Sequence, residues 1–204
     1  MSRVFRADAI SLHRGTRCIV ENFSLNIEPG KVVALLGPNG SGKSTIVSAL
    51  AGDMLPTSGE ILLDDRLLNE ILIAELATLR SVSQQHQRFT LAFAVSDVLS
   101  MTTARSGNTQ SIFEAVHALD IENLMDRKVT SLSGGEQQRV SIAMAFAQET
   151  PYLLLDEPFA AQDVASSARI ALYIQNLAQL GRGILVVAHM NESQLAWCDE
   201  LRRI

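Results

Sequence analysis

A glycine-rich stretch at residues 37–45 limits most strongly what this chain can fold into. It reads Gly-Pro-Asn-Gly-Ser-Gly-Lys-Ser-Thr and fits the phosphate-loop pattern Gly-x-x-x-x-Gly-Lys-Ser/Thr. The aliphatic run 32–36 comes directly before it, and apolar residues at helical spacing follow it as far as Gly52. The sequence therefore predicts a buried strand, a glycine loop and a helix N-terminus in direct succession.

The residue types in this loop suit a polyphosphate. The glycines allow conformations and a close approach that a side chain would block. Lys43 supplies a cation for the terminal phosphates, and Ser44 supplies a hydroxyl ligand for Mg²⁺. Backbone amides and the positive end of the helix dipole point at the same ligand. We expect the whole loop to bind it, through Gly37, Pro38, Asn39, Gly40, Ser41, Gly42, Lys43, Ser44 and Thr45.

Two adjacent carboxylates end the apolar run 152–155. Asp156 lies at the carboxyl end of the predicted strand, where it can reach a hydrated Mg²⁺ beside the phosphates. Glu157 is then free to polarise the attacking water. The alternative is a pair of solvated acids before a turn at Pro158, and the phosphate loop in the same chain favours the catalytic interpretation.

A second glycine motif, Leu-Ser-Gly-Gly-Glu-Gln at 132–137, precedes a segment with helical spacing. Ser133, Gly134 and Gly135 would place a hydroxyl and bare amides at a helix start, which is another anion-binding end. The simpler alternative is that Ser133 is an N-cap and the glycines are a flexible lead-in. That alternative leaves the complete hexad unexplained, so the two glycine motifs predict a shared phosphate site.

The order of the remaining elements predicts an α/β fold with a mostly parallel core sheet. A small N-terminal antiparallel β unit is expected from strands at 9–12 and 23–27, and a helical subdomain at about 86–150. The other strand candidates are 32–36, 61–63, 80–83, 152–155 and 184–188, with a helix at 166–180 between the last two. At 204 residues the chain is expected to form one domain, 1–204, with this subdomain inserted.

Composition excludes several classes of function. The formal net charge of −5 gives no whole-chain electrostatic reason to bind nucleic acid, which is not expected as a partner. The apolar runs are far below the ~20 residues that span a bilayer, and the N-terminus lacks the apolar stretch of a signal peptide. Cys18 and Cys198 have no metal-binding spacing, so we expect two reduced thiols in a cytoplasmic protein.

In its motifs and their order, from about residue 4 to residue 200, the chain resembles the nucleotide-binding domain of ABC transporters. The resemblance implies a P-loop NTPase fold and hydrolysis of ATP with Mg²⁺. By similarity, residues 37–45 are the Walker A motif, 152–156 the Walker B strand and 132–137 the family signature. The catalytic residues implied are Glu157, His189 and Gln85, with Asp163 as the D-loop aspartate and Ser44, Gln85 and Asp156 around the metal. Gln84 is the alternative to Gln85.

Three positions depart from the family pattern. His13 and Arg14 stand where an aromatic residue usually stacks on adenine, so an imidazole or a guanidinium would take that place. The D-loop at 159–163 has alanine and glutamine where the family more often has serine and leucine. The strand and turn that usually follow the region of the switch histidine, His189, are expected to be missing beyond Ile204.

The resemblance implies an ATPase subunit that powers a membrane-embedded permease from the inner face of the cell membrane. Two copies would form a head-to-tail homodimer, with each ATP between Lys43 of one chain and Ser133 of the other. Residues 86–95 look like the same region in importers of iron chelates, haem and cobalamin. The alternative is a soluble ABC-type ATPase not engaged in transport, acting on DNA, ribosomes or cluster assembly. Such proteins usually carry coiled-coil insertions, zinc cysteines or tandem domains.

Overall fold

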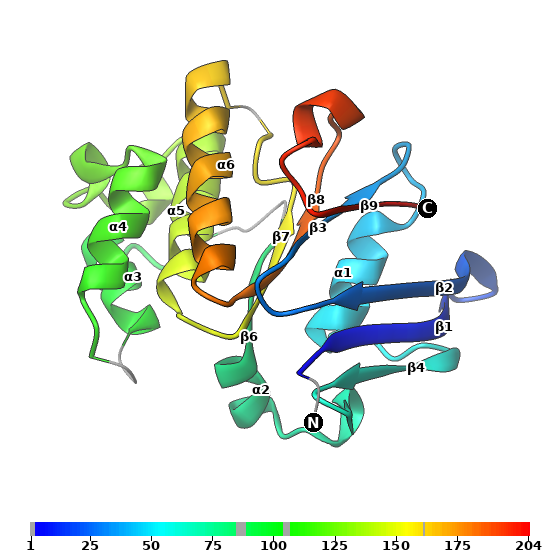
Figure 1. Cartoon of the computed structure of the whole chain (residues 1–204). Coiled ribbons are helices and arrows are strands. Elements are labelled where there is room, and N and C mark those ends of the chain that lie inside the picture. The colour runs from blue at the N-terminus through cyan, green and yellow to red at the C-terminus, as the bar shows by residue number, and fades with distance from the viewer. Residues whose placement is uncertain (1–2, 85–88, 104–106, 161) are drawn as a thin grey trace.

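The protein is described here from a computed structural model that covers residues 3–84, 89–103, 107–160 and 162–204. Two sheets lie side by side, with helices packed around them (Figure 1). The five-stranded sheet is parallel throughout and has the order β6-β7-β8-β3-β9. Its strands are β3 (Val32–Leu36), β6 (Arg80–Ser83), β7 (Tyr152–Asp156), β8 (Gly183–Val187) and β9 (Glu200–Arg203).

The second sheet is antiparallel and has the order β2-β1-β4-β5. Its strands are β1 (Phe5–Arg14), β2 (Arg17–Ile27), β4 (Ser58–Leu63) and β5 (Arg66–Leu67). The helices are α1 (Lys43–Ala51), α2 (Ile73–Leu79), α3 (Val95–Thr102), α4 (Gln110–Leu119), α5 (Gly134–Ala147) and α6 (Val164–Gln179). Short 3-10 helices lie at Leu68–Glu70, Glu122–Leu124, Val129–Ser131 and Glu192–Leu195.

The parallel sheet separates two hydrophobic cores. Side chains of a strand alternate between its faces, so Ala34 of β3 packs with α3 to α6 and Leu35 packs with α1 and the antiparallel sheet. Both residues are fully buried. This two-sided burial explains why the central strands read as continuous aliphatic runs. It also holds the carboxyl ends of β3, β7 and β8 along one edge of the sheet.

Most of the core elements agree with the sequence. The strands expected at 32–36 and 80–83 and the helix that ends before Gly52 have those bounds, and Gly52 closes α1 in the left-handed conformation with φ 83°. Three helices, α3, α4 and α5, lie in the stretch expected to be helical. The mostly parallel sheet and the antiparallel N-terminal unit are both present.

Two features differ from the sequence expectations. The N-terminal strands are longer than 9–12 and 23–27, because the polar residues 13 and 14 continue β1 up to a hairpin turn at Gly15, which has φ 60°. The sequence also did not predict β9, which follows His189 and pairs in parallel with β3 at the sheet edge. Its charged sequence, Glu-Leu-Arg-Arg, is mostly exposed and lacks the apolar run of a buried strand.

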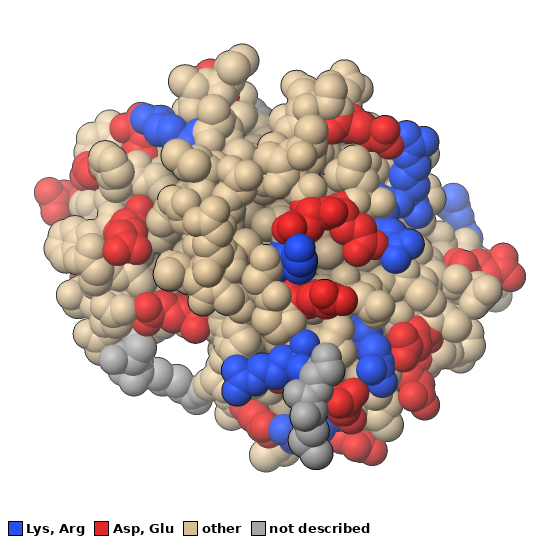
Figure 2. All heavy atoms as spheres, viewed as in Figure 1, with Lys and Arg blue, Asp and Glu red and all other residues tan. Residues whose placement is uncertain are grey.

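On the face in Figure 2, acidic and basic side chains lie interspersed. None of the helices in the described ranges is both long and apolar enough to span a membrane.

Candidate functional site

The phosphate loop joins the end of β3 to the start of α1, and at two of its glycines a Cβ would come closer than 3.0 Å to a neighbouring side chain. At Gly42, φ is 106°, and a Cβ would lie 2.7 Å from Cγ2 of Val20. At Gly37, a Cβ would lie 2.5 Å from Cγ2 of Ile204, the last residue of the chain. The loop is therefore held between the antiparallel sheet on one side and the segment after β9 on the other.

The Lys43 side chain folds back into the loop. The residue is buried, and its ammonium donates hydrogen bonds to the carbonyl oxygens of Gly37 (2.8 Å) and Pro38 (2.9 Å). Burial lowers the pKa of Lys43, while the nearby Glu157 and Asp156 act to raise it. The ammonium thus lies within the loop and faces two carboxylates.

Asp156 ends β7 in a largely desolvated position. Burial raises the pKa of its carboxyl, and this effect outweighs a hydrogen bond from Ser44 and the attraction of Lys43. Among the described residues, no hydrogen-bond partner satisfies its buried Oδ1. A buried oxygen without a partner next to a serine hydroxyl is a donor set that fits Mg²⁺, which prefers oxygen ligands.

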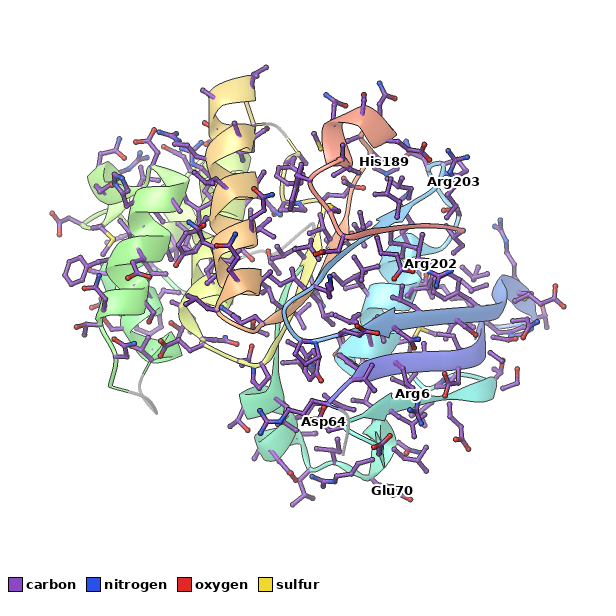
Figure 3. The ribbon with its side chains drawn as sticks, viewed as in Figure 1. Arg6, Asp64, Glu70, His189, Arg202 and Arg203 are labelled. Carbon is purple, nitrogen blue, oxygen red and sulfur yellow. The ribbon has the colours of Figure 1, made fainter. Side chains whose placement is uncertain are left out.

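Glu157 and His189 approach each other from the ends of two neighbouring strands. Nε2 of His189 lies 2.8 Å from Oε1 of Glu157, whose side chain is only 13% exposed. The Glu157 backbone has φ 56°, which is uncommon for a residue other than glycine, and its amide donates to the carbonyl of Val187 at 2.9 Å. Figure 3 shows His189 near Arg203 of β9, and both line a hollow beside the loop.

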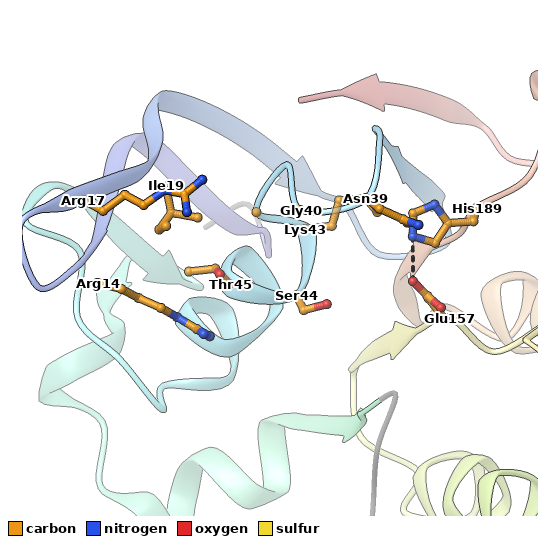
Figure 4. Close-up of a pocket in the computed structure, with 11 residues that line it drawn as sticks. Arg14, Arg17, Ile19, Asn39, Gly40, Lys43, Ser44, Thr45, Glu157 and His189 are labelled. Atoms are coloured by element: carbon orange, nitrogen blue, oxygen red, sulfur yellow. Dashed lines mark ion pairs between the residues drawn. The ribbon is translucent and has the colours of Figure 1, made fainter. Parts of the chain in front are cut away.

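These groups border one open pocket of about 760 Å³ (Figure 4). Glu157 and His189 lie at one end of the view and the β1–β2 hairpin at the other, with the start of α1 between them. The lining residues are Arg14, Arg17, Ile19, Asn39, Gly40, Gly42, Lys43, Ser44, Thr45, Glu157 and His189. Asp156 is buried and is not part of this lining, and neither are Gly37, Pro38 and Ser41 of the loop; Gly37 and Pro38 line the neighbouring hollow beside Arg203.

Residues of the second glycine motif do not line this pocket. Ser133 is exposed and caps α5 in a capping box: its hydroxyl accepts from the Glu136 amide (3.3 Å), and Oε2 of Glu136 accepts from the Ser133 amide (2.7 Å). Gly134 begins the helix and is exposed, and Gly135 follows it. The N-cap interpretation from the sequence is therefore present in the geometry, and Ser133 and Gly134 lie exposed on the surface of the chain.

Asp163 is the N-cap of α6. Its carboxylate accepts from the Ser166 amide (2.8 Å) and hydroxyl (3.0 Å), and these contacts lower its pKa. Gln85 lies outside the described residues. The alternative, Gln84, is exposed, and its amide donates to Asp53 at 3.2 Å.

The hairpin end of the pocket differs from the sequence expectation. His13 is turned to Thr57, with Nδ1 2.9 Å from its hydroxyl, and it is not among the lining residues. Arg14 does line the pocket, and so do Arg17 and Ile19, which the sequence did not single out. The signal that could have identified Arg17 is the hairpin, because Arg17 lies directly opposite Arg14 in the strand register.

Comparisons with known proteins agree with this geometry. A family model described as ABC transporter matches residues 20–160. The hemin import ATP-binding protein HmuV of Rhodococcus jostii (strain RHA1) is 36% identical over 96% of this chain and 70% of the relative. The protein of that name from Pseudomonas aeruginosa is 34% identical over 97% of this chain and 82% of the relative.

Solved structures extend the agreement to the fold. The ATP binding subunit of an ABC transporter matches 100% of this chain and 86% of its own with a TM-score of 0.87 at 21% identity. A dimeric post-hydrolysis ATP-binding cassette bound to ADP and Pi matches 98% of this chain and 94% of its own, with a TM-score of 0.84 at 25% identity. The expected P-loop NTPase fold is confirmed.

Proposed function

Because the chain belongs to the ABC transporter family and is the ATPase subunit of a transporter, we propose that it powers import of haem, an iron chelate or cobalamin through a membrane-embedded permease. Support comes from relatives in several organisms that are named hemin import ATP-binding proteins. They are 33–36% identical to this chain over 96–97% of its length. Haem is the first candidate in this group. The subunit would act as a peripheral protein at the cytoplasmic face of the membrane.

The observation that carries the catalytic proposal is the Glu157–His189 pair at the edge of the phosphate-loop pocket. ATP would place its phosphates in the loop, where Lys43 exchanges its carbonyl contacts for the terminal phosphates. Glu157 would orient the attacking water and accept its proton. His189 would hold Glu157 in place and contact the terminal phosphate from the same side.

Ser44 and Asp156 would hold Mg²⁺, together with Gln85. The buried, unpartnered Oδ1 of Asp156 among the described residues supports this assignment. When bound, Mg²⁺ supplies positive charge to the phosphate oxygens. The chain's own contribution is to hold the Asp156 carboxylate in a desolvated position. The positive charge of Lys43 offsets part of the cost of burying that carboxylate.

The outward position of Ser133, Gly134 and Gly135 supports a site shared between two copies. In a head-to-tail homodimer, these residues and Asp163 of one copy would close on the nucleotide held by the loop of the other. We also propose that residues 1–204 form one ABC-type domain, with the helical subdomain at about 86–150 carrying the signal to the permease.

Replacement of Glu157 tests the catalytic part. Glu157→Gln should lower the ATP turnover rate by about 10²–10⁴-fold, because it removes the base, and should leave ATP binding intact. Turnover is measured by phosphate release, binding by equilibrium titration and dimer formation with Mg·ATP by size-exclusion chromatography. Glu114→Gln, on the exposed face of α4, is the matched control and should behave as wild type. A strictly monomeric Glu157→Gln variant with wild-type turnover would remove this residue from the role.

The cargo is tested separately in cells. A strain that lacks the gene should fail to grow with haem as its only iron source and should recover with wild type but not with Glu157→Gln. Growth on an iron chelate or dependence on cobalamin, assayed in parallel, identifies the cargo within the proposed group. Normal growth of the deleted strain under all three conditions would contradict the proposed import function.

A further inference from the structure

The edge strand β9 contacts both the phosphate loop and the segment that carries His189. Arg203 of β9 lies opposite Leu36, the last residue of β3 before the loop, in the parallel register. Its guanidinium pairs with Glu192, three residues after His189. We infer that Arg203 is a positioning residue for His189, because through Glu192 it holds the imidazole in place relative to the phosphate loop. This inference rests on the proposed function, in which His189 contacts the terminal phosphate.

β9 is fixed to β3 at both of its ends. Before its start, the Asp199 amide donates to the Val32 carbonyl (2.9 Å), and the Asp199 carboxylate accepts from the Val32 amide (2.8 Å). After its end, the Ile204 amide donates to the Leu36 carbonyl at 3.0 Å. The Ile204 side chain occupies the space that a Cβ on Gly37 would need. A side chain on β9 therefore has a fixed attachment beside the phosphate loop.

The segment 189–194, by contrast, has little support from the hydrophobic core. Ala188 before it and Leu195 after it are buried, whereas every residue of the segment except the half-buried Met190 is exposed. The first half of the segment borders an open hollow of about 580 Å³ that the phosphate loop borders too. Exposed segments with few buried apolar contacts are the parts of a fold that open most readily. The position of this segment therefore depends on the polar contacts of its side chains.

Two ion pairs join this segment to other elements in the part of the chain that the structure describes. Nε2 of His189 lies 2.8 Å from Oε1 of Glu157. Oε1 of Glu192 accepts from Nε of Arg203 at 2.9 Å and also from Nη2 of the same guanidinium. Two N–H groups of one planar guanidinium restrict a carboxylate more than a single donor does. The second pair does not line the proposed nucleotide pocket, so it can persist when the first one adjusts to the phosphates.

The alternative is an ordinary surface ion pair, since both side chains are half or more exposed. Exposed pairs contribute little to stability. A small displacement of a catalytic group, however, can lower a rate by as much as about 10²-fold. Positioning therefore predicts a clear loss of rate with little loss of stability, whereas an ordinary surface pair predicts little loss of either.

The first measurement compares Arg203→Met with Arg202→Met in the intact chain. Arg202 is the adjacent residue, but it pairs with Glu200 of the same strand (Figure 3). We expect Arg203→Met to lower kcat for ATP by about fivefold or more, with KM within about twofold, and Arg202→Met to behave as wild type. Both variants should shift the melting temperature by less than about 4 °C. A wild-type kcat for Arg203→Met, or an equal loss for Arg202→Met, would overturn the inference.

The second measurement asks whether Arg203 acts through Glu192 and His189. Glu192→Gln keeps the shape of the side chain but removes its charge, so it should lower kcat as Arg203→Met does. In a chain that already carries His189→Ala, Arg203→Met should lower the residual kcat no further, because no imidazole is left to position. Multiplicative losses in that double variant would show that Arg203 acts independently of His189, which contradicts the inference.

The outcomes also separate this inference from the proposed function. If wild type does not hydrolyse ATP and Lys43→Ala does not change ATP binding, the proposed function fails and the inference falls with it. If Glu157→Gln and His189→Ala lower kcat but Arg203→Met does not, the proposed function stands and only the role of Arg203 is wrong. If ATP is hydrolysed and His189→Ala keeps the wild-type kcat, the inference is wrong because His189 has no position to be held.

Discussion

At the scale of single residues, Asp156 shows how the fold retains a group that weakens it. Its carboxyl is buried, one oxygen has no partner among the described residues, and burial raises its pKa. A raised folded pKa means that the folded state disfavours the ionised form. The arrangement is costly to the nucleotide-free chain and useful to a chain that binds a metal.

We therefore predict that Asp156→Asn raises the stability of the nucleotide-free protein at neutral pH, by about 0.5–2 kcal/mol, while hydrolysis is lost. For a chain of this length, the melting temperature should rise by roughly 1–8 °C. The sign follows from linkage: the carboxyl does not weaken the fold below its unfolded pKa of about 3.9. The penalty grows as the pH rises to the raised folded pKa and is constant above it.

Melting curves of both proteins, measured from just below the unfolded pKa of about 3.9 up to neutral pH without nucleotide or Mg²⁺, provide the check. The advantage of the variant should be largest at neutral pH and should shrink on acidification. Asp126→Asn serves as a control, since that carboxyl lies on the exposed turn before Lys128. A variant less stable than wild type at neutral pH would show that contacts with Ser44 and Lys43 outweigh the desolvation of Asp156.

Sequence motifs anticipated which residues meet at the loop, but not how they contact each other. Parallel strands with their carboxyl ends at one edge bring Asp156, Glu157 and His189 to Lys43, and strand order alone predicts this. The lysine contacts to two loop carbonyls and the rotation of His13 toward Thr57 depend on side-chain geometry. A local pattern does not contain that information.

At the scale of elements, Arg182 joins the C-terminal turn of α5 to the core sheet. The side chain is 8% exposed, and burial lowers its pKa to about 10. It donates to the Phe146 carbonyl (2.9 Å) and lies within hydrogen-bond distance of Ser81 (3.3 Å) and Thr150 (3.4 Å). A cation at a helix C-terminus is favourable, so Arg182 fixes the end of α5 opposite the Ser133 cap.

Removing this group should cost more than an ordinary surface substitution. Arg182→Met should lower the stability by about 2–4 kcal/mol, because buried carbonyl and hydroxyl groups lose their donor. Arg182→Lys keeps the charge but not the planar fork, so its loss should be smaller. Chemical denaturation measures both.

The control for this comparison is Arg169→Met on α6, where the arginine is exposed and pairs with Asp120 at 3.3 Å. Exposed pairs contribute little, so a loss below about 1 kcal/mol is expected. Equal losses for Arg182→Met and Arg169→Met would mean that the buried network does not hold α5 in place.

The elements that the sequence predicted well are those buried on both faces. β3, β7 and β8 read as aliphatic runs because both sides pack against apolar layers. β9 was missed because an edge strand of charged residues is stabilised by its pairing with β3, which no local pattern records. The same reason accounts for the short estimate of β1 and β2, whose exposed residues alternate with buried ones up to the hairpin.

At the scale of the whole molecule, the two sheets are joined around Tyr152. Its ring is fully buried, and its hydroxyl donates to Oδ1 of Asp64 at 2.7 Å. The same carboxylate oxygen accepts from the Val4 amide at 3.1 Å, and Phe5 packs edge-on against the tyrosine ring. A residue of the parallel sheet thus holds the antiparallel sheet, which carries the hairpin arginines, against the phosphate loop.

The remaining question at this scale is whether one chain completes the site. The described lining of the pocket holds Lys43 but none of the second glycine motif, and Ser133 points outward as the cap of α5. If two copies meet head to tail, each site takes Lys43 from one chain and Ser133 from the other. Lesions placed on different chains should then complement each other in trans.

We predict that a mixture of Lys43→Ala and Ser133→Arg chains regains ATPase activity that neither has alone. In the heterodimer, one site carries both lesions and the other carries neither, because the two residues of a site come from different chains. Since half of the chains in a random mixture pair as heterodimers with one intact site each, activity should reach up to about a quarter of wild type if sites act independently. Phosphate release on mixing measures it, and crosslinking counts the heterodimers. An inactive mixture that contains heterodimers would refute independent shared sites. Adding Glu157→Gln to the Lys43→Ala chain is the internal check. Because Lys43 and Glu157 line the same pocket, both lesions then fall in the site that is already inactive, and the intact site should be unaffected.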